Sequence, residues 1–94
     1  MSTEATIAVR HNEAKRRFEA GSPGNPAHVD YLIVGQTMEI YHTESPTQYQ
    51  GQGLAGKIAA EALAWARANS FKVIASCSYV TSFIAKRPEY QDLL

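Results

Sequence analysis

The chain of 94 residues has a single cysteine, Cys77, so it cannot form an internal disulfide bond. One cysteine and three histidines are too few for the usual structural zinc sites, and we expect no bound metal. No apolar run is long enough to cross a membrane. Residues 1–4 lack the charged start and the apolar run of a secretory signal. Together these absences favour a reducing, cytoplasmic location.

An excess of charge of either sign is also missing. Lys plus Arg and Asp plus Glu number nine each, so the net charge at pH 7 is zero. This balance argues against nucleic acid as a partner, and we expect no membrane partner either. Hydrophobic residues make up 45% of the chain, which is typical of a folded globular protein. We expect one domain over residues 1–94, as a monomer or as a weak dimer formed through an exposed strand edge.

The first half of the chain has the composition of β-strands separated by turn-forming residues. The clearest turn is the run Gly-Ser-Pro-Gly-Asn-Pro at 21–26. A turn is also predicted at His11 and Asn12, and Phe18 among polar neighbours suggests an edge strand. We therefore expect an antiparallel meander with strands over 7–10, 15–20, 28–34 and 37–43.

The second half predicts helices and one more strand. An amphipathic helix is expected over 54–69, with a broad apolar stripe for packing on a sheet. The apolar run 71–77 follows this helix, so we expect a crossover strand parallel to the last meander strand. A short helix over 79–86 ends before Pro88. The predicted fold class is α+β, with a meander, a long helix, a crossover strand and a short C-terminal helix.

The segment 49–57, Tyr-Gln-Gly-Gln-Gly-Leu-Ala-Gly-Lys, is a glycine-rich turn that opens directly into the long helix. Such a junction leaves unpaired backbone N–H groups at the positive end of a helix, where phosphate groups bind. A plain turn between strand and helix is the alternative, because glycine-rich turns are common. A Walker loop is excluded because Lys57 is followed by Ile58 and not by Ser or Thr. A dinucleotide fingerprint is excluded because the turn follows a meander.

Residues 50–55 fit the pattern Q/R-x-x-G-x-G/A, and further motifs occur in order along the chain at 9–12, 17–18, 42–46, 77–80 and 87–90. In this combination the chain resembles the GNAT superfamily of acetyltransferases, and within it a minimal subfamily of small acetyltransferase-like proteins. The resemblance covers nearly the whole chain. The chain departs from the subfamily at Gln50 and Gln52, which replace a usual basic residue, and at Ser45, Ser70 and Ala75.

The resemblance implies that the protein binds acetyl-CoA and transfers its acetyl group to an amine, for which a protein lysine and an amino terminus are candidates. The loop would hold the diphosphate of CoA, and the pantetheine arm would pair with strand backbone before the loop. The expected CoA-binding residues are Thr43, Glu44, Ser45, Gln50, Gly51, Gln52, Gly53, Leu54, Ala55, Gly56 and Lys57. One alternative is a CoA- or acyl-CoA-binding module with little or no turnover, and another is an interaction domain that binds no CoA.

Three side chains are candidates for catalysis. Under the resemblance, Cys77 lies near the thioester and either accepts the acetyl group or only lines the tunnel; a lone cysteine is more often a small buried hydrophobic residue. His42 or Glu44 would relay the proton of the amine, whereas the alternative is that His42 is an ordinary strand residue with a satisfied hydrogen bond; the strand position of His42 predicts a face shared with Met38 and Ile40, and also with Glu44. Tyr79 would protonate the leaving thiolate or simply pack on CoA.

Overall fold

A computed structural model describes residues 8–49, 51 and 53–94. In the described part of the chain, five strands form one sheet in the order β1–β2–β3–β4–β5, and the pairing is antiparallel except between β4 and β5. The elements in chain order are β1 (Val9–Asn12), η1 (Glu13–Lys15), β2 (Arg17–Ala20), β3 (Ala27–Val34), β4 (Thr37–Glu44), η2 (Thr47–Tyr49), α1 (Leu54–Ala68), β5 (Lys72–Ala75), α2 (Ser78–Ala85) and η3 (Pro88–Leu93).

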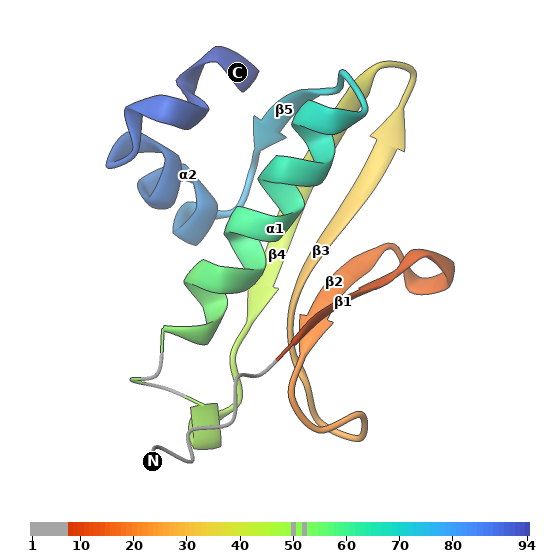
Figure 1. Ribbon diagram of the computed structural model, residues 1–94, viewed down its shortest axis with the longest axis vertical. Coiled ribbons are helices and arrows are strands. Elements are labelled where there is room, and N and C mark those ends of the chain that lie inside the picture. Colours follow the sequence, from red (N-terminus) through yellow and green to blue (C-terminus); the bar gives the residue numbers. More distant parts are fainter. Residues whose placement is uncertain (1–7, 50, 52) are drawn as a thin grey trace.

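This arrangement confirms the expected fold class of a meander, a long helix, a parallel crossover strand and a short C-terminal helix. Helix α1 lies across one face of the sheet, and α2 and η3 group together on the β5 side of α1 (Figure 1). Within the described ranges, no helix combines the length and the apolar character needed to cross a membrane.

The core lies between α1 and the sheet. Helix α1 contributes Ile58, Leu63 and three alanines that are fully buried, and the sheet contributes Val29, Met38 and Ile40. Alanine favours the helix and lets its backbone approach the strands closely. The helix begins after Gly53 and ends at Ala68, where Ser70 then adopts a left-handed conformation with φ 61°. The predicted helix over 54–69 is therefore correct to within one residue.

An extra residue in β4 reverses the faces on which the side chains of its last residues lie. The β3–β4 register shifts between Asp30 and Tyr31, so that Tyr31 pairs with Ile40 whereas Asp30 pairs with His42. Tyr41 is left between these pairs as a β-bulge and is 46% exposed. Side chains alternate along a strand, so His42 lies on the face opposite to Ile40. The predicted face shared by Met38, Ile40 and His42 is therefore wrong.

The N-terminal hairpin also differs from the prediction. His11 and Asn12 are paired residues of β1, and the turn comes one step later at η1, where the Asn12 side chain accepts a hydrogen bond from the Lys15 backbone N–H. Phe18 is buried in β2, which lies between β1 and β3, so the edge strand is β1. A local turn prediction fails here because the imidazole of His11 stacks on the Phe18 ring, with ring centroids 4.0 Å apart.

His11 belongs to an aromatic cluster under the C-terminal half of α1. Its Nε2 lies 2.5 Å from the hydroxyl of Tyr31, and its ring meets the edge of Trp65 with centroids 4.8 Å apart. Burial lowers the pKa of His11 below its usual value of 6.5, and the nearby Glu13 carboxylate opposes this shift. Burial likewise raises the pKa of Tyr31. The folded state therefore favours the neutral imidazole.

We expect the folded protein to lose stability as the pH falls through the usual pKa of His11. In that range the unfolded chain takes up a proton that the folded chain does not, so unfolding becomes easier, whereas above it His11 has no effect. Urea unfolding between about pH 7.5 and about pH 5 would measure the free energy of unfolding. The variant His11→Gln keeps a partner for Tyr31 but cannot titrate. An equal pH dependence in both proteins would contradict the assignment.

Candidate functional site

Strands β4 and β5 separate in the middle of β4. Their pairing ends at Ile40 and Ala75, and the Ile40 carbonyl then accepts hydrogen bonds from the backbone N–H groups of Ser76 (2.9 Å) and Cys77 (3.3 Å). Beyond this point the chain turns into α2, whereas β4 continues to Glu44. In the described part of the chain, residues 41–44 therefore have a strand partner on the β3 side alone. The bulge at Tyr41 begins at the same place.

Thr43 and Cys77 face each other across this gap. Because of the bulge, Thr43 pairs with the buried Val29 and lies on the α1 side of the sheet. Its Oγ1 lies 3.2 Å from the Sγ of Cys77, within hydrogen-bond distance. Cys77 is the residue that precedes α2, and its thiol is partly exposed. The gap therefore holds a nucleophilic atom beside a hydroxyl, at the positive end of a helix.

The glycine-rich loop lies at the start of α1. Gly53 precedes the first helical residue, Leu54, and as a glycine it has no side chain to cap this end of the helix. Gly51 and Gly53 both have positive φ, 84° and 70°, and a Cβ at either position would meet nothing within 4 Å. A ligand can therefore approach these two glycines closely, and the first N–H groups of the helix have no partner within the helix. The expected ligands Gln50 and Gln52 lie outside the described residues.

The other expected loop residues lie in the first turn of α1. Lys57 is exposed there, Leu54 is buried in the core, and Ala55 is half-buried. Gly56 faces α2, because a Cβ on it would lie 3.4 Å from the hydroxyl oxygen of Tyr79. The hydroxyl of Tyr79 thus lies beside the first turn of α1.

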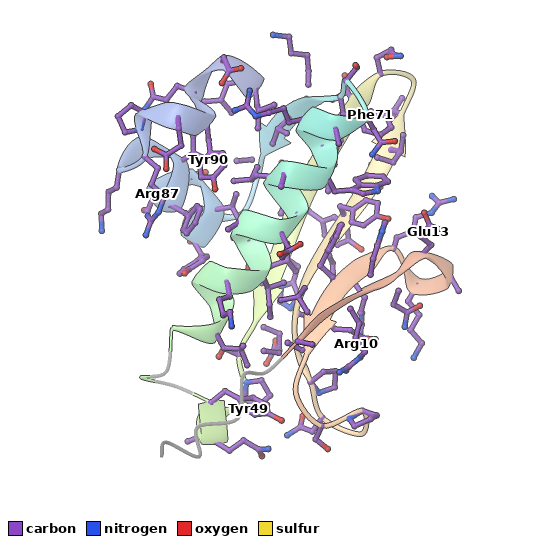
Figure 2. All side chains as sticks on the ribbon, viewed as in Figure 1. Arg10, Glu13, Tyr49, Phe71, Arg87 and Tyr90 are labelled. Carbon is purple, nitrogen blue, oxygen red and sulfur yellow. The ribbon has the colours of Figure 1, made fainter. Side chains whose placement is uncertain are left out.

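A cavity of about 490 Å³ opens on α2 next to this turn. It is lined by Ser78, Tyr79, Ser82, Phe83, Lys86 and Arg87. The Arg87 guanidinium lies over the Phe83 ring, 3.8 Å from its centroid, and Figure 2 shows Arg87 and Tyr90 close to α2. Lys86 and Arg87 were not among the predicted site residues. Tyr79 of the same cavity lies beside Gly56, so the packing of α2 against α1 decides where this cavity lies, which no local pattern reveals.

The other face of β4 carries acidic and imidazole groups. Glu39 is half-buried at the point where the strands separate, and its Oε2 accepts a hydrogen bond of 2.6 Å from the hydroxyl of Ser76. His42 is exposed, and its Nε2 lies 3.1 Å from the Oε1 of Glu44. His42 and Glu44 share a face, as expected. Sequence reasoning missed Glu39; a carboxylate between the apolar residues Met38 and Ile40 was the available signal.

The arrangement includes an exposed strand edge, a thiol, helix N–H groups that have no partner within the helix, and the cations Lys57, Lys86 and Arg87. An amide-containing chain can pair with the edge, and a phosphate group can accept from the N–H groups. Carboxylate and imidazole groups on the far face can take up protons. Among residues 8–49, 51 and 53–94, no three His, Cys, Asp or Glu side chains are grouped so that they would hold a metal ion.

Comparison with known proteins places this geometry in a family. The sequence model of the GCN5-related N-acetyltransferase family matches residues 17–93. The chain is 28% identical over 96 residues to protein NATD1 of Xenopus tropicalis, covering 99% of this chain and 88% of the relative. It is 30% identical to human protein NATD1 over 90 residues, covering 93% and 80% of the two chains.

The fold has a solved counterpart. The solution structure of a GCN5-like protein from Staphylococcus aureus superposes with a TM-score of 0.70 at 28% sequence identity, covering 92% of this chain and 85% of the other. The family match, the relatives and the structural neighbour therefore agree with each other, and the chain belongs to the GCN5-related N-acetyltransferase family.

Proposed function

We propose that the protein is an N-acetyltransferase that binds acetyl-CoA in the gap between β4 and β5 and transfers the acetyl group to an amine. One observation carries the proposal: the two strands separate at Ile40, and β4 runs on from there toward the end of the molecule where α1 begins after Gly53 (Figure 1). Family membership supports acetyl-CoA as the cosubstrate.

In this proposal the pantetheine arm replaces β5 as the neighbour of β4. Its two amides pair with backbone groups of Thr43 and Glu44, in the way that an added strand pairs with a sheet edge, and Ser45 continues this contact. Thr43 and Cys77 are in contact across the gap. An arm that pairs with Thr43 therefore ends with its thioester near Cys77.

The diphosphate of CoA binds the first turn of α1. The N–H groups from Gly53 to Gly56 provide the hydrogen bonds, and Lys57 provides the nearest positive charge in that turn. Lys86 and Arg87 line the adjacent cavity and take the other phosphate charge of the nucleotide. Tyr79 packs beside Gly56, which supports a role in lining the CoA site more than one in proton transfer to the thioester.

Two routes of acetyl transfer fit the geometry. In the covalent route, the Cys77 thiolate attacks the acetyl carbonyl, the CoA thiolate leaves and takes up a proton, and the amine then attacks the acetyl-cysteine. In the direct route, the amine attacks acetyl-CoA after losing a proton to Glu39 or His42. Glu39 is the better placed of the two, because it accepts a hydrogen bond from Ser76, the residue that precedes Cys77. The acceptor approaches from the outer face of β4.

The alternative is a module that binds CoA or acyl-CoA with little or no turnover. This alternative is favoured because both candidate general bases already have partners. Glu39 accepts a hydrogen bond from Ser76, and His42 contacts Glu44. Tight CoA binding without acetylation of peptides that carry lysine or a free amino terminus would distinguish this module from the enzyme.

The variant Gly53→Glu is expected to lose CoA binding. It places a negative charge where the diphosphate would bind, so we expect an affinity at least about 100-fold lower, measured by calorimetry with CoA. Gly35→Glu is the matched control, because Gly35 also has positive φ, 61°, and open surroundings but lies in the β3–β4 turn. Equal CoA affinity in wild type and Gly53→Glu would refute the loop assignment.

Cys77 is expected to become acetylated if the covalent route operates. Incubation with acetyl-CoA should add the mass of one acetyl group to the intact protein, and mass spectrometry should locate it on Cys77. The Cys77→Ala variant should neither form the adduct nor transfer the acetyl group. An active Cys77→Ala protein without any adduct in the wild type would establish direct transfer instead.

Glu39 is expected to act as the base of the direct route. Glu39→Gln keeps a partner for Ser76 but cannot accept a proton, so we expect kcat to fall about 100-fold near neutral pH with little change in KM for acetyl-CoA. A more alkaline assay should recover part of the rate, because more of the amine is then deprotonated. His42→Gln is the control. A larger loss in His42→Gln than in Glu39→Gln would assign the base to His42.

A further inference from the structure

Tyr49 directly precedes the glycine-rich loop and is buried, although the preceding residues of η2 are exposed. A buried tyrosine hydroxyl needs a hydrogen-bond partner. Tyr49 Oη accepts a hydrogen bond of 2.6 Å from the backbone N–H of Ser22, in the turn between β2 and β3. Figure 2 shows Tyr49 at the end of the molecule where α1 begins. One end of the loop is thus tied to a turn that is distant in sequence.

Gly21 makes this contact sterically specific. A Cβ at position 21 would lie 2.4 Å from Tyr49 Oη and 2.5 Å from Tyr49 Cζ, so the ring occupies the space of a side chain. Gly21 also has a φ of 99°, which L side chains rarely adopt. Its carbonyl accepts a hydrogen bond of 3.0 Å from Nη1 of Arg10 in β1. The turn is therefore held from both sides, by Arg10 and by Tyr49.

The two described glycines of the loop have open surroundings. A Cβ at Gly51 or Gly53 would meet nothing within 4 Å, so these two residues have no close packing on their open side. The residues on either side of the loop are, by contrast, packed against the rest of the molecule. Leu54 fixes one end in the core, and Tyr49 fixes the other.

We propose that Tyr49, seated against Gly21 and Ser22, positions the glycine-rich loop for the diphosphate of CoA. We call this the Tyr49–Gly21 contact. The proposal rests on the proposed function of the loop. Tyr49 acts through the loop and not on CoA itself, so it is a positioning residue. The contact makes CoA affinity depend on the β2–β3 turn, which lies outside the CoA site.

Two variants test the contact. Tyr49→Phe removes the hydrogen bond alone and should weaken CoA binding about fivefold. Gly21→Ala displaces the ring and should weaken it at least about tenfold. Two controls should leave CoA affinity unchanged: Gly24→Ala lies in the same turn with nothing nearby, and Gly35→Ala has the same kind of backbone strain, with φ 61°, but no ring contact.

The contact also predicts that the two residues act as one unit. In the Tyr49→Leu background, Gly21→Ala no longer displaces a ring, so it should cost much less CoA affinity than it does in the wild type. Binding is measured by calorimetry with CoA and with pantetheine, which lacks the diphosphate. A loop-positioning role weakens CoA binding and leaves pantetheine binding unchanged, whereas general loss of structure weakens both.

Amide resonances of Gly51 and Gly53 give a readout that does not require CoA binding. They should shift in Tyr49→Phe, while resonances of β5 stay in place. If they shift but the wild type binds no CoA, the contact is supported and the proposed function fails. If the wild type binds CoA, but Tyr49→Phe changes neither the affinity nor these resonances, the proposal is overturned. If Gly21→Ala does not fold, Tyr49→Phe decides the outcome.

Discussion

The extra residue in β4 is the constraint on which the site depends. Side chains alternate along a strand, so one inserted residue exchanges the faces of all residues that follow it. Up to Ile40, the buried residues of β4 point to α1; after Tyr41, Thr43 takes that side and meets Cys77. The bulge coincides with the end of β5 pairing at Ile40, so the strand changes face where its edge becomes accessible. Without it, His42 would face Cys77 and Thr43 would face outward.

The two ends of α1 have different surroundings. Its middle is rich in alanine and packs closely on the sheet, and its C-terminal half covers the aromatic cluster around His11 and Trp65. Its first turn begins after a glycine, which has no side chain to cap the helix, and Lys57 in that turn is exposed. The packing that stabilises the fold is thus separated from the groups that a ligand would use, and the buried Leu54 and Tyr49 connect them on either side of the loop.

Much of the fold followed from the sequence because the relevant signals are local. The meander, the long helix, the crossover strand and the short helix all lie close to their predicted positions, since each depends on composition within a short window. The errors at His11 and His42 have one cause. His11 looked like a turn residue but is held in β1 by stacking on Phe18, and the face of His42 changed through pairing with β3. Both effects come from contacts between distant segments.

The candidate site likewise has features that follow from local sequence and features that depend on contacts between distant segments. The sequence by itself determined where the helix starts and that glycines precede it, because positive φ and unpaired N–H groups are properties of a few consecutive residues. It also predicted that Cys77 ends the crossover strand, whereas β5 ends at Ala75 and Cys77 directly precedes α2. Only the tertiary structure decided that Thr43 contacts Cys77, that Ser76 holds Glu39, and that Lys86 and Arg87 line one cavity with Tyr79. These contacts depend on strand register and helix packing, which are set by the whole core and not by any single segment.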